Sequence, residues 1–347
     1  MKKSLKLIAV AASLTLITGV AVAPSAQAAK IKLCLALDTG GVDDRSFNEG
    51  AWKGAQASTV STAEYLSAAS SADFAPNIKK FVDKGCDLIV GVGFAISAEI
   101  VKSAKANPKI KYAVVDDAGE DCDANFNCKP VANVKGLTFQ TDEAAFMAGY
   151  LAAGVSKTGK VATYGGAPYP TVTIFMDGYA RGVDYYNKQK GKSVKVLGWD
   201  PANPKSGTFV GNFSDQTKAL TISKGFEQQG ADVILPVGGN LGAPYAAESE
   251  KSKKSLTIWV DSDGFGLLTA GKTILLTTVV KEIGASIKSV AKDVANKKFN
   301  GSKYVGTLKN KGVSIAPYHD LSGRVPGQLK LEVRKLRDQI IAGTLKI

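Results

Sequence analysis

The chain has 347 residues, 45% of them hydrophobic, and its 44 lysines and arginines outnumber its 31 aspartates and glutamates by 13. This length is enough for two α/β domains, each with a substantial core. The basic residues are scattered at helix-surface spacing, without a basic block or a helix-turn-helix motif, so we expect a solvated basic surface and no nucleic-acid partner.

Residues 1–28 predict a signal peptide, because a short basic start and an apolar run precede Ala26-Gln27-Ala28, the A-x-A pattern of a cleavage site. Cleavage after Ala28 would leave 319 residues (347 − 28) and lower the formal charge to +10, since three lysines are removed. The alternative is an uncleaved membrane anchor, for which the apolar run is short. No lipobox cysteine lies near the site, so we expect an exported, soluble protein of the periplasm or cell surface without a lipid anchor.

Short apolar runs alternate with helix-period segments from residue 31 to about residue 280, which is typical of an α/β protein. The predicted strands are Ile31–Leu37, Asp87–Val92, Tyr112–Val115, Val134–Phe139, Lys160–Tyr164, Val194–Leu197, Asp232–Val237, Thr257–Val260 and Ile274–Val280.

The first predicted strand is followed by GGVDDRSFNEGAW, residues 40–52, a polar segment that leads into a predicted helix. Ser46 and Glu49 match the S-x-x-E capping box, in which each side chain bonds to a backbone amide at the helix start. Three polar residues remain without a structural role, at the kind of strand-to-helix junction where open α/β sheets bind ligands: Asp43, Asp44 and Asn48.

The four cysteines fit the oxidising compartment that export predicts. Cys122 and Cys128 flank a short polar loop, which a disulfide could close. Cys34 and Cys86 lie near two early strands and could pair or remain buried thiols. The sequence contains no CxxC and a single histidine, so we expect no zinc site and no cofactor.

An internal repeat appears when the chain is aligned with itself at a shift of 145 residues. GCDLIVGVG (85–93) then falls on GADVILPVG (230–238), with nine identities in 32 positions where about two are expected by chance. A second match, at a shift of 128, places EGAWKG (49–54) on DGYARG (177–182). The chain therefore contains two related α/β halves, which predicts a ligand cleft between two lobes.

The repeat also aligns polar residues at strand ends. Asp116 and Asp261 occupy the same position in the two halves, each at the end of an apolar run. A turn acid or a helix cap is the alternative for either residue alone. Gly93 and the pair Gly238-Gly239 also end strands, where the missing Cβ lets a backbone amide approach a ligand or permits a tight turn.

Two enzymatic alternatives have formal support. GLLTAGKT (266–273) matches the P-loop pattern, but the β-branched run that follows predicts a strand where a P-loop needs a helix, so we interpret Gly271-Lys272 as a turn. No GxSxG motif occurs, and His319 is interpreted as a surface histidine. A carboxylate pair such as Asp44 and Asp261 could hydrolyse a glycosidic bond, and this alternative stays open, although repeated lobes favour binding over catalysis.

The segment GGVDDRSFNEGAW resembles the signature of the basic membrane protein family of ABC-transporter substrate-binding proteins. Further resemblances follow in the family's order and cover the whole mature chain: YAVVDDA, DEAAFMAGYLAA, NFSD, ILPVGGNLG, WVDSD, LTTVVK, VGTLKNKGV and IIAGTLKI. The resemblance implies a periplasmic-binding-protein type I fold, with two Rossmann-like lobes, three crossings and a ligand cleft. It also implies a non-enzymatic, monomeric receptor that delivers its ligand to a permease. Characterised members include purine-nucleoside receptors, and at least one relative binds riboflavin.

The resemblance also implies residue roles. Asp44 and Asn48 would bind the base of a nucleoside, with Asp43 sharing the role of Asp44, and Phe213 would stack on that base. Asp261 and Lys281 would hold the ribose. The other residues predicted to line or bind are Ser46, Phe47, Asp116, Gly238 and Gly239. The alternatives are cap residues for Asp44 and Asn48, a core residue for Phe213 and a solvated strand end for Lys281.

The expected lobes are residues 30–140 plus 264–303 and residues 141–263 plus 304–347, with crossings near Thr141, Asp263 and Lys303. The final helix could pack on either lobe. The segment YGGAPYPTV (164–172) departs from the family pattern at a strand end of the second lobe, which allows a different ligand preference. A purine ribonucleoside is the expected ligand; riboflavin, a sugar or hydrolysis of a nucleoside or glycoside are the alternatives.

Overall fold

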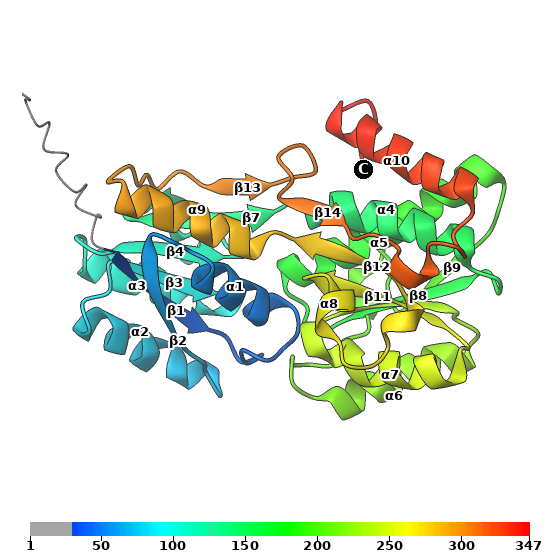
Figure 1. Ribbon diagram of the computed structural model, residues 1–347, viewed down its shortest axis with the longest axis horizontal. Helices are drawn as coiled ribbons and strands as arrows, with labels where there is room; N and C mark the ends of the chain where they lie inside the picture. The colour runs from blue at the N-terminus through cyan, green and yellow to red at the C-terminus, as the bar shows by residue number, and fades with distance from the viewer. Residues whose placement is uncertain (1–29, 126) are drawn as a thin grey trace, which may run out of the picture.

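The structure is a computed structural model that describes residues 30–347 except residue 126, so the predicted signal peptide lies outside the described residues. Two α/β lobes lie side by side, and each is built around one six-stranded sheet (Figure 1). This arrangement confirms the predicted two-lobed α/β fold. Among the described helices, none is long and apolar enough to cross a membrane.

The first sheet is entirely parallel and has the order β13-β7-β4-β3-β1-β2. Helices cover both faces, so the central strands are continuous apolar runs with alternate side chains in two separate cores. The strands are β1 (Ile31–Leu37), β2 (Ser61–Leu66), β3 (Leu88–Val92), β4 (Lys111–Val115), β7 (Val134–Phe139) and β13 (Tyr304–Gly306). The helices are α1 (Phe47–Gln56), α2 (Phe74–Asp83), α3 (Ser97–Ala106) and α9 (Ile283–Ala295).

The second sheet has the order β14-β12-β11-β10-β8-β9, and only β14 runs antiparallel to its neighbour. Its strands are β8 (Lys160–Gly165), β9 (Lys195–Leu197), β10 (Val233–Val237), β11 (Leu256–Asp261), β12 (Leu275–Lys281) and β14 (Val313–Ile315). Its helices are α4 (Thr141–Val155), α5 (Pro170–Lys190), α6 (Gln216–Gln228), α7 (Ala243–Ser252) and the short α8 (Gly264–Leu267).

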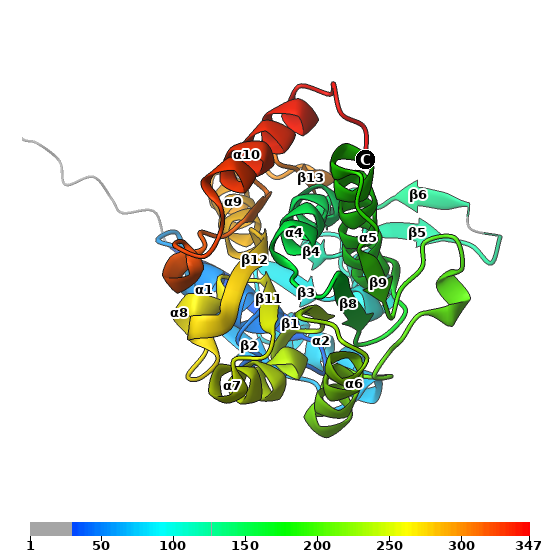
Figure 2. The ribbon, with the colours of Figure 1, turned by 90° about the vertical axis from the view of Figure 1, so that its right-hand side faces the viewer.

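The C-terminal helix α10 (Gly327–Ile341) packs on the second lobe, against α4 (Figure 2). The Tyr150 hydroxyl of α4 lies 2.9 Å from Glu332 of α10, and Lys190 of α5 lies 2.6 Å from the same carboxylate. The structure thus decides which lobe carries the helix, a choice that the sequence left open.

The predicted lobe boundaries are wrong for two strands. β12 was assigned to the first lobe, but it pairs with β11 in the second sheet, and β13 was assigned to the second lobe, but it pairs with β7 in the first. The turn after α8 returns the chain beside β11, and consecutive strands tend to be neighbours in a sheet. The chain therefore passes between the lobes after β7, after β12 and after β13.

Glycines allow one helix of each lobe to approach its neighbour closely. A Cβ on Gly54 of α1 would overlap the backbone of Gly284 on α9, and a Cβ on Gly182 of α5 would overlap the carbonyl of Phe146 on α4. Gly54 and Gly182 are equivalent in the repeat at a shift of 128. The two halves therefore share their helix packing as well as their strand order.

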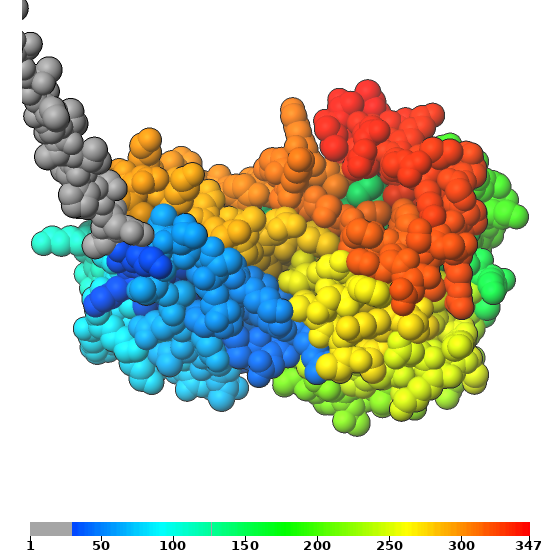
Figure 3. Space-filling model, viewed as in Figure 1, coloured from blue at the N-terminus to red at the C-terminus, as the bar shows by residue number. Residues whose placement is uncertain are grey.

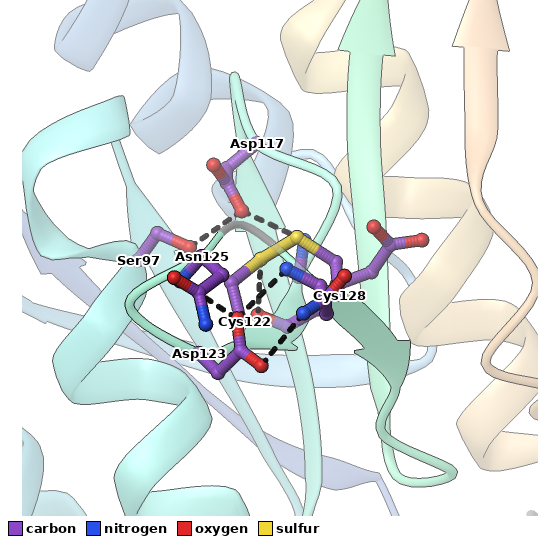
Figure 4. The surroundings of a disulfide bond; sticks show 9 residues. Ser97, Asp117, Cys122, Asp123, Asn125 and Cys128 are labelled. Carbon is purple, nitrogen blue, oxygen red and sulfur yellow. Dashed lines mark hydrogen bonds between the residues drawn. A yellow bond between two sulfur atoms is a disulfide. The ribbon is translucent and has the colours of Figure 1, made fainter.

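All four cysteines form disulfides. Cys34 pairs with Cys86, which joins β1 to the segment before β3, so these cysteines are not free thiols. Cys122 pairs with Cys128 and closes the hairpin of β5 (Glu120–Cys122) and β6 (Cys128–Pro130), as Figure 4 shows. The structure thus settles the pairing of the four cysteines, which the sequence left open.

The P-loop-like segment is a turn followed by β12, as predicted. Gly271 has a φ of +88°, which suits a residue without a Cβ. The amides of Gly271 and Thr273 donate to the carboxylate of Glu250 at 2.7 and 2.9 Å, and these bonds lower the pKa of that carboxyl. The chain's own carboxylate therefore takes the amides that a P-loop would offer to phosphate.

Candidate functional site

A cavity of about 270 Å³ lies between the lobes, at the carboxyl ends of strands from both sheets. The first lobe contributes residues that follow β1, β3 and β4, and the second contributes residues that follow or end β10, β11 and β12. This is the position where parallel α/β sheets bind ligands. The volume is close to the lower end of the range for small-molecule pockets, about 300–1,000 Å³.

The predicted capping box is wrong, because Asp44 rather than Ser46 caps α1. The Asp44 carboxylate accepts the amides of Ser46, Asn48 and Glu49 at 3.0, 2.8 and 3.0 Å. Ser46 has no side-chain cap bond, and Glu49 pairs with Lys53 instead. A carboxylate two residues before Ser46 reaches several free amides at once, which a single hydroxyl does not.

Asn48 has a buried acceptor without a hydrogen-bond partner among the described residues. Its amide nitrogen donates to Asp38 at 2.8 Å and to Asp44 at 3.1 Å. Because carboxylates only accept hydrogen bonds, they fix the Asn48 amide with its NH₂ group toward them. Asn48 lines the cavity, and its Oδ1 is buried without a hydrogen-bond partner in the described part of the chain. Such an atom is costly unless a ligand donates to it.

Asp38 belongs to the site and the sequence reasoning missed it. It follows β1, lines the cavity and accepts the Gly40 amide at 2.9 Å as well as the Asn48 side chain. Burial raises the pKa of its carboxyl, and these two hydrogen bonds oppose the shift. The signal was available, since Asp38 closes an apolar strand just as Asp116 and Asp261 do.

Lys281, at the end of β12, lies between the two repeat-equivalent carboxylates. Its Nζ is 3.0 and 2.9 Å from the two oxygens of Asp116 and 3.6 Å from Asp261. All three residues are buried and line the cavity. Asp116 and Asp261 have φ values of +69° and +65°, which non-glycine residues rarely adopt. Strained backbone of this kind clusters at functional sites.

Burial dominates the electrostatics of the site. It raises the pKa of Asp44 to about 7, against the lowering effect of the three amide bonds. It raises the pKa of Asp116 to about 6, although Lys281 opposes the shift. Burial alone would lower the pKa of Lys281, but Asp116 and Asp261 outweigh it and the net shift is upward, so the ammonium stays charged.

Aromatic side chains form one wall of the cavity. Phe213 and Tyr169 are stacked with ring centroids 6.0 Å apart and an interplanar angle of 28°, and Phe94 lies 5.4 Å from Tyr169. All three rings line the cavity, and Phe213 packs over Gly166. Tyr169 and Phe94 were not predicted as site residues, although Tyr169 belongs to the segment whose composition departs from the family pattern.

Two more aromatic rings make cation–π contacts with the ammonium of Lys281. Phe47 and Phe175 line the cavity, and Nζ lies 5.0 and 5.2 Å from their ring centroids. Cation–π contacts of this kind partly replace the water that a buried ammonium has lost. Lys281 is therefore not the solvated strand end that the sequence left as an alternative.

The remaining predicted site residues divide into those that reach the cavity and those that do not. Gly238 and Gly239 line it, and Gly239, with φ +56°, lies against Asp44 and Ser46. Asp43 is exposed and is not among the lining residues. Ser46 is fully buried but bonds to the second lobe instead of lining the cavity.

Metal ligation finds no support among residues 30–347, with residue 126 left aside. Cys34, Glu64 and Cys86 form the one cluster of potential ligands with suitable spacing. The two sulfurs of that cluster are joined in a disulfide, so they are not available as thiolates.

Two α/β lobes with mostly parallel sheets, which enclose a polar and aromatic cavity, make up a periplasmic-binding-protein-like fold. Solved structures of ABC-transporter solute-binding proteins share this fold. One from Aeropyrum pernix K1 has a TM-score of 0.76 at 23% identity and covers 91% of this chain and 92% of its own. One from Conexibacter woesei has a TM-score of 0.68 at 21% identity, with 91% and 98% covered.

The chain belongs to the family of PnrA-like ABC transporter substrate-binding proteins, whose model matches residues 31–347. It is similar to the ABC transporter nucleoside-binding protein BmpA of Lactococcus lactis, at 28% identity over 91% of this chain and 89% of the relative. It is also similar to basic membrane protein A1 of Borrelia garinii, at 29% identity over 89% and 86%. The family resemblance seen in the sequence is thereby confirmed, and the family is one of binding proteins rather than enzymes.

Proposed function

We propose that this protein, after export, captures a purine ribonucleoside between its lobes as a monomer and delivers it to the permease of an ABC importer. The observation that carries the proposal is the cavity's combination of a free buried acceptor on Asn48, a stacked aromatic wall and a lysine held between two carboxylates. Each element matches one part of a nucleoside. The nucleoside-binding relative from Lactococcus lactis supports the same ligand class.

The base would bind at the Asn48 end of the cavity. Asn48 Oδ1 has no partner among the described residues, and the carboxylates of Asp38 and Asp44 lie at the Asn48 side-chain nitrogen, so this end accepts hydrogen bonds rather than donating them. A base edge with N–H groups complements such a site. The flat face of the base would stack on the Phe213 and Tyr169 rings, a contact that any base can make.

The ribose would bind at Lys281. Asp116 and Lys281 pair closely, whereas Asp261 stands 3.6 Å from the ammonium and keeps acceptor capacity for a sugar hydroxyl. A carboxylate beside an ammonium offers both an acceptor and a donor to vicinal hydroxyls. A 2′-deoxynucleoside would leave part of this pair unsatisfied and should bind more weakly by about 1–3 kcal/mol.

The charges of the cavity disfavour phosphate. Four carboxylates line it against one ammonium: Asp38, Asp44, Asp116 and Asp261 against Lys281. Repulsion between like charges is strong in a buried site, so a nucleotide should bind far more weakly than its nucleoside.

Calorimetric titration of the purified protein with inosine, guanosine, adenosine, uridine, riboflavin and ribose tests the proposal. We expect the purine ribonucleosides to bind most tightly. Asp261→Ala should abolish most of this affinity, while Asp215→Ala should leave it intact because Asp215 caps α6 outside the cavity. Saturation by riboflavin or ribose with no response to nucleosides would overturn the ligand assignment.

Chromatography of the same mixtures tests the hydrolase alternative. We expect every nucleoside to be recovered intact, whereas release of free base would make Asp44 and Asp261 catalytic candidates.

Genes for a permease and an ATPase beside this one would support the importer, and the mass of the secreted chain would show whether residues 1–28 are removed.

A further inference from the structure

A two-residue turn of the first lobe, Arg45-Ser46, is inserted into the second lobe. The Ser46 hydroxyl lies 2.7 Å from the carbonyl oxygen of Val260 and 2.9 Å from Asp261 Oδ2, so its proton is shared between them. The Ser262 hydroxyl donates to the Ser46 carbonyl at 2.9 Å. Figure 3 shows the early, blue part of the first lobe against the yellow part of the second.

Arg45 adds two more contacts between the lobes. Its carbonyl accepts the indole N–H of Trp259 at 3.1 Å, and its guanidinium donates to Thr269 at 3.1 Å. Arg45 has a φ of +53°, a conformation that costs free energy for a residue with a Cβ. The hydrogen bond from Trp259 to the Arg45 carbonyl can offset the free energy of this backbone strain.

The bonds of the Ser46 hydroxyl are buried, those of the Arg45 and Ser46 carbonyls are partly buried, and the Arg45–Thr269 bond is exposed. Ser46 is 0% exposed and Trp259 is 1% exposed, and the two bonds of the Ser46 hydroxyl are shielded from water. Arg45, Ser46 and Trp259 do not line the cavity, but their neighbours Asp44 and Asp261 do. These three residues can therefore affect how the lobes close without themselves contacting a ligand in the cavity.

We propose that Arg45, Ser46 and Trp259 form an interlobe latch, which sets the fraction of ligand-free protein that is closed and thereby the affinity for any ligand. The inference rests on the proposed binding function but not on the identity of the ligand. When only a fraction of the protein is in the closed, binding-competent state, the apparent dissociation constant equals the intrinsic constant divided by that fraction. Loss of the latch therefore weakens all ligands by one common factor.

Tryptophan emission of the ligand-free protein tests the latch directly. The chain has three tryptophans, so Trp52→Phe with Trp199→Phe leaves Trp259 as the sole emitter. In that background we expect Ser46→Ala to shift the emission to longer wavelength, to increase quenching by acrylamide and to enlarge the radius of gyration from small-angle scattering. Unchanged emission and size would show that these contacts are fixed parts of the hinge and would overturn the proposal.

The control is Ser61→Ala. Ser61 is also buried and bonds to the Ser58 hydroxyl at 2.7 Å, but both serines belong to the first lobe. This variant should leave emission and size unchanged. Should Ser46→Ala fail to fold, Arg45→Met, which loses the guanidinium contact with Thr269, and Trp259→Phe, which loses the indole donor, give the same readout by scattering.

Titration separates the latch from the ligand assignment. Ser46→Ala should raise the apparent dissociation constants of all binding ligands roughly tenfold, by the same ratio for each, so that their order is kept. A change in the order of ligands would place Ser46 in recognition and contradict the latch. If no nucleoside binds at all, the proposed function fails, while the emission of the ligand-free protein still decides the latch.

Discussion

The two lobes share one backbone plan but contribute different chemistry. Asp116 and Asp261 end equivalent strands with nearly the same φ, +69° and +65°. Asp116 nonetheless pairs closely with Lys281 of the other lobe, whereas Asp261 is 3.6 Å from that ammonium and bonds to Ser46 across the interface. Equivalent positions therefore have the same backbone conformation, whereas their hydrogen-bond and ion-pair partners come from the opposite lobe.

A second pair of equivalent positions differs even in residue type. At a shift of 128, Asp38 of the first lobe corresponds to Gly166 of the second. Asp38 holds Asn48 by a hydrogen bond, whereas Gly166 makes room for the ring of Phe213. One lobe thus supplies most of the polar side chains at the Asn48 end of the cavity, and the other supplies two of its three wall rings.

The largest loss of stability is expected at the cluster of Lys281, Asp116 and Asp261, to which both lobes contribute. Lys281→Met leaves Asp116 and Asp261 buried without their ammonium, so the free energy of unfolding should fall by about 3–5 kcal/mol in urea denaturation. Adding Asp116→Asn should restore part of the loss. Lys53→Met, which breaks the surface pair with Glu49, should cost less than about 1 kcal/mol. Equal losses in the two lysine variants would contradict the shared cluster.

An intermediate effect is expected from the equivalent glycines. Gly54→Ala and Gly182→Ala each force a Cβ into the backbone of a neighbouring helix, so each should destabilise by about 1–3 kcal/mol in thermal unfolding. Gly225→Ala, in open space on α6, should be neutral or stabilising by about 0.5–1 kcal/mol. A loss in only one lobe would show that the two helix contacts are not equivalent.

A different kind of effect, a pH dependence of stability, is expected from Asp44 of the first lobe. Burial raises the pKa of Asp44 to about 7, so its contribution to stability is present below about pH 4 and is lost as the pH rises through 7. Asp44→Asn should reduce this decline between pH 4 and 7 by at most about 1.4 kcal/mol per pH unit. Urea denaturation across that range measures it, with Asp43→Asn, an exposed neighbour, as the control. Identical pH profiles for wild type and Asp44→Asn would refute the assignment.

Much of the site was predictable because strand direction alone decides where strand ends meet. Asp44, Asn48, Asp116, Gly238, Gly239 and Asp261 all reach the cavity as the pattern indicates. The same logic, applied to every acid after an apolar run, would have found Asp38. It could not find the Tyr169 and Phe94 rings, because an aromatic residue in a loop has the same sequence signal whether it lines a cavity or packs on its own lobe.

The sequence by itself determined the alternation of strands and helices, the two related halves and the polar strand ends, since these depend on local periodicity and on the direction of parallel strands. Only the tertiary structure decided that Asp44 caps α1, that Ser46 bonds to the second lobe and that β12 and β13 join opposite sheets. The reason is distance along the chain: Lys281 meets Asp116 across 165 residues and Ser46 meets Val260 across 214. Such pairings depend on how two folded lobes close on each other, which no local pattern encodes.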